Sequence, residues 1–216
     1  MKLVLVDIDG TFVRGSTERR FAFWLIRRRV VGPSQWLAYA LFALRWWPRY
    51  GLHTLKKNKA YLRGLERRSI ALLAQQFVSE EIPRLLFAPC VDRVRSHLAA
   101  GDKIVFLSGT LDIIAAALAH SLGVDDAVGT KCAVEAGRYT ANPPLLHPFG
   151  VAKKVIAEQL SRDFEISLEN TVALANSRSD LPLLEIVGTG VAVKPDSGLQ
   201  RAAQLRRWEV IRTECI

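Results

Sequence analysis

Two carboxylates lie one residue apart near the start of the chain. The stretch VDIDGTF, residues 6–12, places Asp7 and Asp9 directly after the apolar run LVLV and before Gly10. Two like charges at the end of a strand add little to a hydrophobic core. An aspartate can attack a phosphoryl group and form an aspartyl-phosphate, and hard oxygen ligands of this kind suit Mg²⁺. The alternative is a solvated strand end that turns at Asp-Gly.

Other polar side chains follow apolar runs in the same way. Ser108 and Gly109 follow the run KIVFL, and Asn176 ends the run TVALAN, with Asp180 four residues further on. Each has an ordinary alternative: Ser108 in a strand-to-helix turn, Asn176 in a turn, and Asp180 as an acid at a helix start, where the dipole favours it. Their positions after strands nevertheless predict that they meet at one edge of a sheet.

A lysine near position 153 completes this set. Lys153 and Lys154 both lie near the start of an amphipathic stretch, residues 151–163. The alternative is that both are surface lysines. The residues alone leave open which of the two belongs to the site.

The elements that must position these residues alternate between strand and helix. Short apolar runs predict strands at 2–7, 103–108, 171–176, 190–195 and 208–213. Helices are predicted at 112–123, 151–163 and 179–188, the last opening with an N-cap serine, and a short hairpin turning at Ala136-Gly137 is predicted within 132–141. This alternation predicts an α/β fold with a Rossmann-like parallel sheet that carries helices on both faces.

Residues 15–89 interrupt this alternation. They contain no convincing strand, and helical stretches are predicted at 17–31, 35–47, 54–65 and 69–88, with breaks at Gly32-Pro33-Ser34 and at Pro48. We therefore predict a core made of residues 1–13 and 90–216, and a helical cap, residues 14–89, inserted after the first strand. A cap in this place would lie over the carboxyl edge of the sheet.

Charge is concentrated in the predicted cap. The 216 residues carry a net charge of +9, from 30 Lys and Arg against 21 Asp and Glu. Residues 14–68 hold 14 basic residues and only Glu18 and Glu66 as acids, a net of +12, so the remaining 16 basic and 19 acidic residues give −3. The cap is therefore expected to face anions such as phosphates, acidic lipid headgroups or nucleic acid.

The cysteines and the first residues indicate a reducing compartment. Cys90, Cys132 and Cys215 are odd in number, far apart and without a CxxC pair, which argues against a disulfide framework, a zinc cage or a catalytic thiol. The four histidines form no ligand pattern. A charge at Asp7 comes too early for a secretory h-region. We expect a cytoplasmic protein.

Four motifs in order resemble those of the haloacid dehalogenase superfamily. They are DIDGT at 7–11, FLSGT at 106–110, the lysine near 153, and ANSRSDLPLLE at 175–185. The insertion after the first motif and the ending VAVKPDSGLQRAAQLRRWEVI, residues 191–211, resemble the subgroup that includes phosphoserine phosphatase. The resemblance covers residues 1–13 and about 90–212, and is weak within the insertion. It implies a phosphatase that works through an aspartyl-phosphate with Mg²⁺ as cofactor.

The resemblance also implies roles for the first motif and the metal site. Asp7 would be the nucleophile, and Asp9 would protonate the leaving alkoxide and then activate water. Asp7, the backbone carbonyl of Asp9 and Asn176 would hold Mg²⁺. The family usually has aspartate at the position of Asn176, so one negative charge is missing and weaker metal binding is expected.

The remaining motifs are assigned to the phosphoryl group and its charge. By resemblance, Ser108 and the Gly109 N–H would bind phosphoryl oxygens. Lys153 would offset charge on the nucleophile and the phosphate, and Asp180 would hold Lys153 or a metal-bound water.

The substrate and partners stay open at this point. The basic cap predicts a phosphorylated small molecule with extra negative charge, or a phosphorylated lipid headgroup, rather than phosphoserine. A phosphotransferase with an alcohol acceptor is one alternative, and a catalytically weakened phosphate- or membrane-binding relative is another, for which Asn176 is the only hint.

The aromatic-rich stretch WLAYALFALRWW, residues 36–47, also has two interpretations. It is too short for a bilayer span, which takes ~20 apolar residues, and we expect a core helix of the cap. The sharper alternative is an interfacial helix in peripheral contact with an anionic membrane. Contact with nucleic acid ranks lowest, since the sequence shows no nucleic-acid module.

Overall fold

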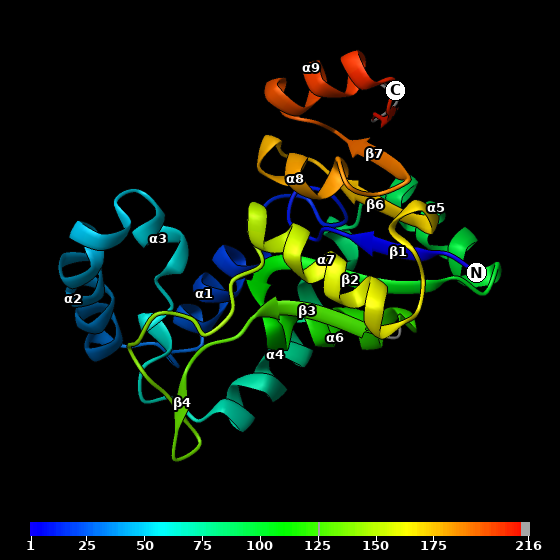
Figure 1. Ribbon diagram of the computed structural model, residues 1–216. Helices are drawn as coiled ribbons and strands as arrows, with labels where there is room; N and C mark the ends of the chain where they lie inside the picture. Colours follow the sequence, from blue (N-terminus) through cyan, green and yellow to red (C-terminus); the bar gives the residue numbers. More distant parts are fainter. Residues whose placement is uncertain (125, 213–216) are drawn as a thin grey trace.

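A computed structural model describes residues 1–124 and 126–212. Within them, a six-stranded parallel sheet has the strand order β3-β2-β1-β6-β7-β8 (Figure 1). Its strands are β1 (Leu3–Val6), β2 (Lys103–Leu111), β3 (Asp126–Thr130), β6 (Thr171–Ala175), β7 (Thr189–Val193) and β8 (Glu209–Ile211). The crossing from β2 back to β6 places β1 at the centre, so the first motif lies in the middle of the edge where parallel strands end.

Alternate side chains of β1 enter two different hydrophobic clusters. Val4 and Val6 pack toward α5 (Ala88–Ala99) and α6 (Asp112–Leu122). Leu3 and Leu5 pack toward α7 (Val151–Asp163), α8 (Leu181–Leu184) and α9 (Ser197–Arg206). All four side chains are fully buried, as expected for a parallel strand covered on both faces. The predicted fold class is confirmed.

The inserted helices lie between β1 and β2. They are α1 (Thr17–Arg27), α2 (Pro33–Tyr50), α3 (His53–Lys57), a 3₁₀ turn η1 (Ala60–Leu62), α4 (Arg67–Glu81) and a 3₁₀ turn η2 (Pro83–Leu85). Residues of α1 and α4 share the buried cluster that contains Val4 and Val6, whereas Ala38 and Phe42 of α2 form a separate small cluster with Ala60. The division into a core and a cap at residues 13 and 90 stays a prediction.

Several predicted boundaries in this segment are wrong. α2 does not end before Pro48 but includes it, and Pro33 begins the helix, where its missing N–H costs nothing. The stretch 54–65 divides into α3 and η1, because Asn58 takes an extended conformation. α1 ends at Arg27 and α4 at Glu81, each earlier than predicted.

The rest of the chain follows the prediction with local differences. α7 has the predicted bounds, and the hairpin of β4 (Val134–Glu135) and β5 (Arg138–Tyr139) turns at Ala136-Gly137 as predicted. The predicted helix 179–188 is a 3₁₀ turn η4 (Arg178–Asp180) followed by the short α8, and its capping serine is Ser177. α5, β3 and α9 were not predicted. The last predicted strand includes Thr213, which lies outside the described residues.

Candidate active site

The first motif forms a tight turn at the carboxyl end of β1. The Asp7 N–H still donates to the Leu174 carbonyl of β6 at 3.0 Å, so the nucleophile candidate is held by the sheet itself. Gly10 then takes a φ of +82°, and a side chain there would lie 2.3 Å from Asn176 Nδ2. Glycine is therefore required both by the backbone conformation and by the approach of Asn176.

Asp7 is bound on both of its carboxylate oxygens. Lys153 Nζ lies 2.7 Å from Asp7 Oδ1 and 2.9 Å from Asp180 Oδ1, and all three side chains are buried. Burial alone lowers the pKa of Lys153, but the two carboxylates outweigh burial and raise it, so the ammonium stays charged. Burial raises the pKa of Asp180 in spite of Lys153. Lys154 instead points outward and lies 4.0 Å from Glu158.

The other oxygen of Asp7 faces Asn176 through a threonine. Thr11 Oγ1 lies 2.9 Å from Asp7 Oδ2 and 3.3 Å from Asn176 Oδ1. A carboxylate oxygen and an amide oxygen thus converge on one small region, and both are hard donors of the kind that Mg²⁺ prefers. The donor set fits the predicted metal. No cluster of three or more His, Cys, Asp or Glu ligands occurs in residues 1–124 and 126–212.

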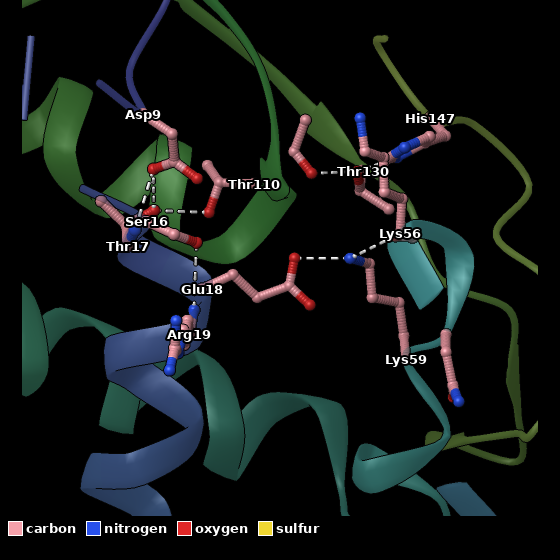
Figure 2. A network of polar contacts seen from close by, with 12 residues as sticks. Asp9, Ser16, Thr17, Glu18, Arg19, Lys56, Lys59, Thr110, Thr130 and His147 are labelled. Atoms are coloured by element: carbon pink, nitrogen blue, oxygen red, sulfur yellow. Dashed lines mark hydrogen bonds and ion pairs between the residues drawn. The ribbon is translucent and has the colours of Figure 1, made fainter. Parts of the chain in front are cut away.

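Asp9 points to the start of helix α1. Its Oδ1 accepts from the Thr17 N–H at 2.9 Å and from Thr17 Oγ1 at 2.6 Å, and Thr17 Oγ1 lies 2.7 Å from Thr110 Oγ1 (Figure 2). Burial raises the pKa of Asp9 to about 6, although both hydrogen bonds from Thr17 lower it. A carboxyl group with such a pKa can be protonated or ionised near neutral pH, as a general acid and base requires.

Ser108 and Gly109 occur inside β2 rather than after it. The predicted strand end at residue 108 is wrong, because β2 continues to Leu111. The register with β3 shifts between Leu107 and Leu111, and this irregularity takes the two predicted phosphate ligands out of regular pairing. Thr130 Oγ1, at the end of β3, donates to the Gly109 carbonyl at 2.6 Å and holds this irregular part of β2 in place.

The predicted residues come together in one cleft. A cavity of about 640 Å³ opens between the carboxyl edge of the sheet and the inserted helices, and it is lined by all seven predicted site residues: Asp7, Asp9, Ser108, Gly109, Lys153, Asn176 and Asp180. Their catalytic and metal-binding roles stay predictions.

The inserted segment contributes an acid, Glu18, that was counted in the charge of the sequence but not assigned to the site. Glu18 lines the cleft, and Lys59 Nζ lies 2.5 Å from its Oε2 (Figure 2). The Tyr61 hydroxyl donates to Glu18 Oε1 at 3.3 Å. Thr17 was also missed. The available signal for Glu18 was its position as the first of only two acids in a segment of net charge +12.

The cysteines that the structure describes are buried free thiols. Burial raises the pKa of Cys90 and of Cys132 to about 12, which keeps both protonated and unreactive. Cys215 lies outside the described residues.

Comparisons with known proteins agree with this geometry. A histidinol-phosphatase from Neisseria meningitidis is 27% identical over 97% of both chains, and a phosphoserine phosphatase from Mycobacterium tuberculosis is 27% identical over 94% of this chain and 68% of its own. The crystal structure of a Bordetella pertussis protein of unknown function matches with a TM-score of 0.81 at 27% identity, covering 97% of each chain.

More distant structures share the fold. An apo phosphoserine phosphatase, 19% identical, has a TM-score of 0.63 over 97% of this chain and 92% of its own. The sequence model of the haloacid dehalogenase-like hydrolases matches residues 4–185. The chain therefore belongs to the haloacid dehalogenase-like hydrolase family, as its four motifs predicted.

Proposed function

We propose that this protein is a Mg²⁺-dependent phosphomonoester hydrolase that works through an aspartyl-phosphate on Asp7. The observation that carries the proposal is the position of Asp7, which lies buried at the centre of the sheet edge and is ion-paired to Lys153 at 2.7 Å. The retained second aspartate, Asp9, favours phosphoryl transfer over dehalogenation. The names of its relatives as phosphatases support the same reaction class.

The reaction proceeds in two displacements. A carboxylate oxygen of Asp7 attacks phosphorus, the ester P–O bond breaks, and Asp9 gives its proton to the departing alkoxide. Asp9 then takes a proton from water as that water attacks phosphorus, which releases inorganic phosphate and restores the carboxylate. Lys153 offsets the charge on Asp7 and on the phosphoryl group throughout, and Asp180 holds Lys153 in place.

The proposed ligands of the metal and of the phosphate lie at the same carboxyl edge of the sheet. Asp7, the Asp9 carbonyl and Asn176 would hold Mg²⁺, which when bound reduces repulsion between the nucleophile and the phosphate. Ser108 and the Gly109 N–H bind phosphoryl oxygens. Thr130 holds the Gly109 carbonyl, so Gly109 needs little rearrangement to receive the phosphate.

The cleft favours a small substrate with a second charged group. Its inserted side combines Arg19 and Lys56 with the Glu18–Lys59 pair. Extra negative charge on the substrate is therefore accommodated. Glu18 also offers a carboxylate to a substrate amine, so the basic composition of the segment no longer argues against a substrate such as phosphoserine. A panel of phosphoserine, histidinol phosphate, glycerol phosphate and phosphatidic acid separates small substrates from a lipid-linked one.

The direct test is the variant Asp7→Asn with p-nitrophenyl phosphate and Mg²⁺. The wild type should release phosphate, and the variant should lose at least about a thousandfold in kcat, because an amide cannot serve as the nucleophile. Circular dichroism of both proteins controls for folding. Lys154→Met, at the adjacent half-buried lysine that pairs with Glu158 instead of Asp7, should keep its activity. An unchanged rate for Asp7→Asn would refute the mechanism. With glycerol added as an acceptor, formation of phosphorylated glycerol in place of inorganic phosphate would identify a phosphotransferase.

A further inference from the structure

Helix α2 exposes an apolar face to solvent. Five large side chains along it are 46 to 76% exposed: Trp36, Leu37, Leu41, Leu44 and Trp47. The three leucines follow the spacing i, i+4 and i+7, so they lie in one stripe, and the tryptophans flank it near the two ends of the helix. We call these five residues the outer face of α2. The opposite side of the helix buries Ala38 and Phe42.

This arrangement is unusual for a surface helix. A helix that covers a core normally turns polar side chains outward, but α2 contains no acid, and its only charged residues are Arg45 and Arg49. A contiguous apolar surface of this kind marks a place where a partner or a membrane binds. In Figure 1 α2 lies at the left edge of the molecule, beside α3 and away from the strands of the sheet.

Positive charge surrounds the outer face of α2. Arg45 lies one turn after Leu41, Arg49 follows another turn on, and both are exposed. Helix α3 packs against α2 and adds two lysines, of which Lys57 lies 4.4 Å from the centre of the Tyr50 ring. The surrounding segment, residues 14–68, carries a net charge of +12.

Charge decides between the two occupants that an apolar face could take. A second copy of this chain, bound through the same face, would bring two segments of net +12 together, and like charges oppose that association. An anionic lipid surface offers the complementary charge together with an apolar interior. Tryptophan at the ends of an apolar stripe and arginine at its border are the side chains that settle at headgroup depth.

We propose that the outer face of α2 docks on an anionic lipid bilayer, with the helix lying in the plane of the interface. No helix among the described residues is long and apolar enough to cross a membrane. Trp36 also lines the cleft, so the docking face and the cleft share a side chain. The proposal concerns a surface and holds whatever the substrate of the cleft is.

Vesicle co-sedimentation tests the proposal with the full chain. Vesicles of phosphatidylglycerol and phosphatidylcholine should bind the wild type, vesicles of phosphatidylcholine alone should bind it weakly, and added salt should release it, since the attraction is screened. The double variant Leu41→Glu, Leu44→Glu should bind the anionic vesicles at least about tenfold more weakly, because it places charges at the depth of the apolar stripe.

A control variant introduces a glutamate at an exposed leucine of another helix. Leu205 on α9 is 82% exposed, and Leu205→Glu should bind like the wild type. Hydrolysis of p-nitrophenyl phosphate and circular dichroism show whether each variant is folded, since neither leucine of α2 lines the cleft. Equal vesicle binding by the double variant and by Leu205→Glu would overturn the proposal. The proposal would also be overturned if the wild type does not bind anionic vesicles but forms a dimer in light scattering, and if the double variant does not form this dimer.

Discussion

At the scale of single residues, Asn176 is the clearest departure from the family pattern. It lies at the carboxyl end of β6, and its side-chain oxygen shares Thr11 with Asp7. The amide is therefore in the right place for a metal ligand but contributes no negative charge. A neutral ligand gives a divalent cation less electrostatic stabilisation than a carboxylate in the same position.

The variant Asn176→Asp should bind Mg²⁺ more tightly than the wild type. A new carboxylate close to Asp7 would repel it in the absence of metal, and this repulsion is relieved when the cation binds. Titration calorimetry with Mg²⁺ alone measures the affinity without depending on turnover, and we expect about a tenfold lower Kd. Asn170→Asp, which changes an asparagine on the 3₁₀ turn before β6, is the matched control. Equal Kd values for Asn176→Asp and the wild type would contradict the assignment of Asn176 as a ligand.

At the scale of elements, helix α1 joins the inserted segment to the proposed acid and base. Thr17 is the first residue of α1, is fully buried, and donates twice to Asp9 Oδ1. Asp9 thus accepts from the N-terminus of this helix, where a carboxylate is favoured by the dipole and by the free N–H groups. The orientation of Asp9 depends on where α1 begins.

Replacement of Thr17 by valine should lower kcat more than it changes KM. Valine keeps the backbone N–H but loses the hydroxyl that bridges Asp9 and Thr110. Since positioned acid and base groups contribute about a hundredfold or more, we expect a loss of about ten- to a hundredfold in kcat with p-nitrophenyl phosphate. Thr17→Ser restores the hydroxyl and should recover most of the rate. If Thr17→Val and Thr17→Ser are equally active, the hydroxyl does not position Asp9.

The elements that the sequence predicted well are those with a strong local pattern. The apolar runs of β1 and β6 are buried on both faces, and α7 begins after Gly150, which takes a φ of +59°. β3 was missed because it begins with Asp126 and forms an edge of the sheet. Pro48 was a misleading signal, since a proline in the last turn of a helix removes one hydrogen bond without ending the helix.

The residues of the candidate site also differ in how far the sequence could predict them. Residues at strand ends could be predicted, because a parallel sheet brings its carboxyl ends to one edge whatever their separation in sequence. Contacts from the inserted helices could not. Glu18 and Lys59 are separated by 41 residues, and their ion pair depends on how α1 packs against η1 rather than on any local pattern.

At the scale of the whole molecule, the two sides of the cleft meet at His147. Its Nδ1 lies 2.9 Å from Thr130 Oγ1, and because that hydroxyl donates to Gly109, Nδ1 must carry the proton. Nε2 is buried and has no hydrogen-bond partner among the described residues. Burial is the main cause that lowers the pKa of His147 to about 4, and the positive charges of Lys59, Lys57, Lys56 and His53 from the inserted segment lower it further.

This neutral histidine should make the folded protein less stable in acid. Below its ordinary pKa of 6.5 the unfolded chain takes up a proton that the folded chain, with a pKa of about 4, does not. The contribution of His147 to the free energy of unfolding is constant above pH 7. It falls by about 3 kcal/mol as the pH drops to 4. Asp9 has the opposite effect on stability. Because its pKa is raised in the folded protein, it stabilises the fold as the pH falls through about 6.

Urea unfolding of the wild type and of His147→Gln between pH 7 and pH 4.5 isolates this group, because the contribution of Asp9 is common to both proteins. Glutamine can still bond to Thr130 but cannot titrate in this range, so the variant should lose less stability than the wild type over the interval, by about 2 kcal/mol. His120 on α6 is exposed, and His120→Gln should retain the wild-type dependence of the free energy of unfolding on pH. Parallel slopes for the wild type and His147→Gln would mean that His147 takes up its proton in the folded protein, and that the basic inserted segment does not hold it neutral.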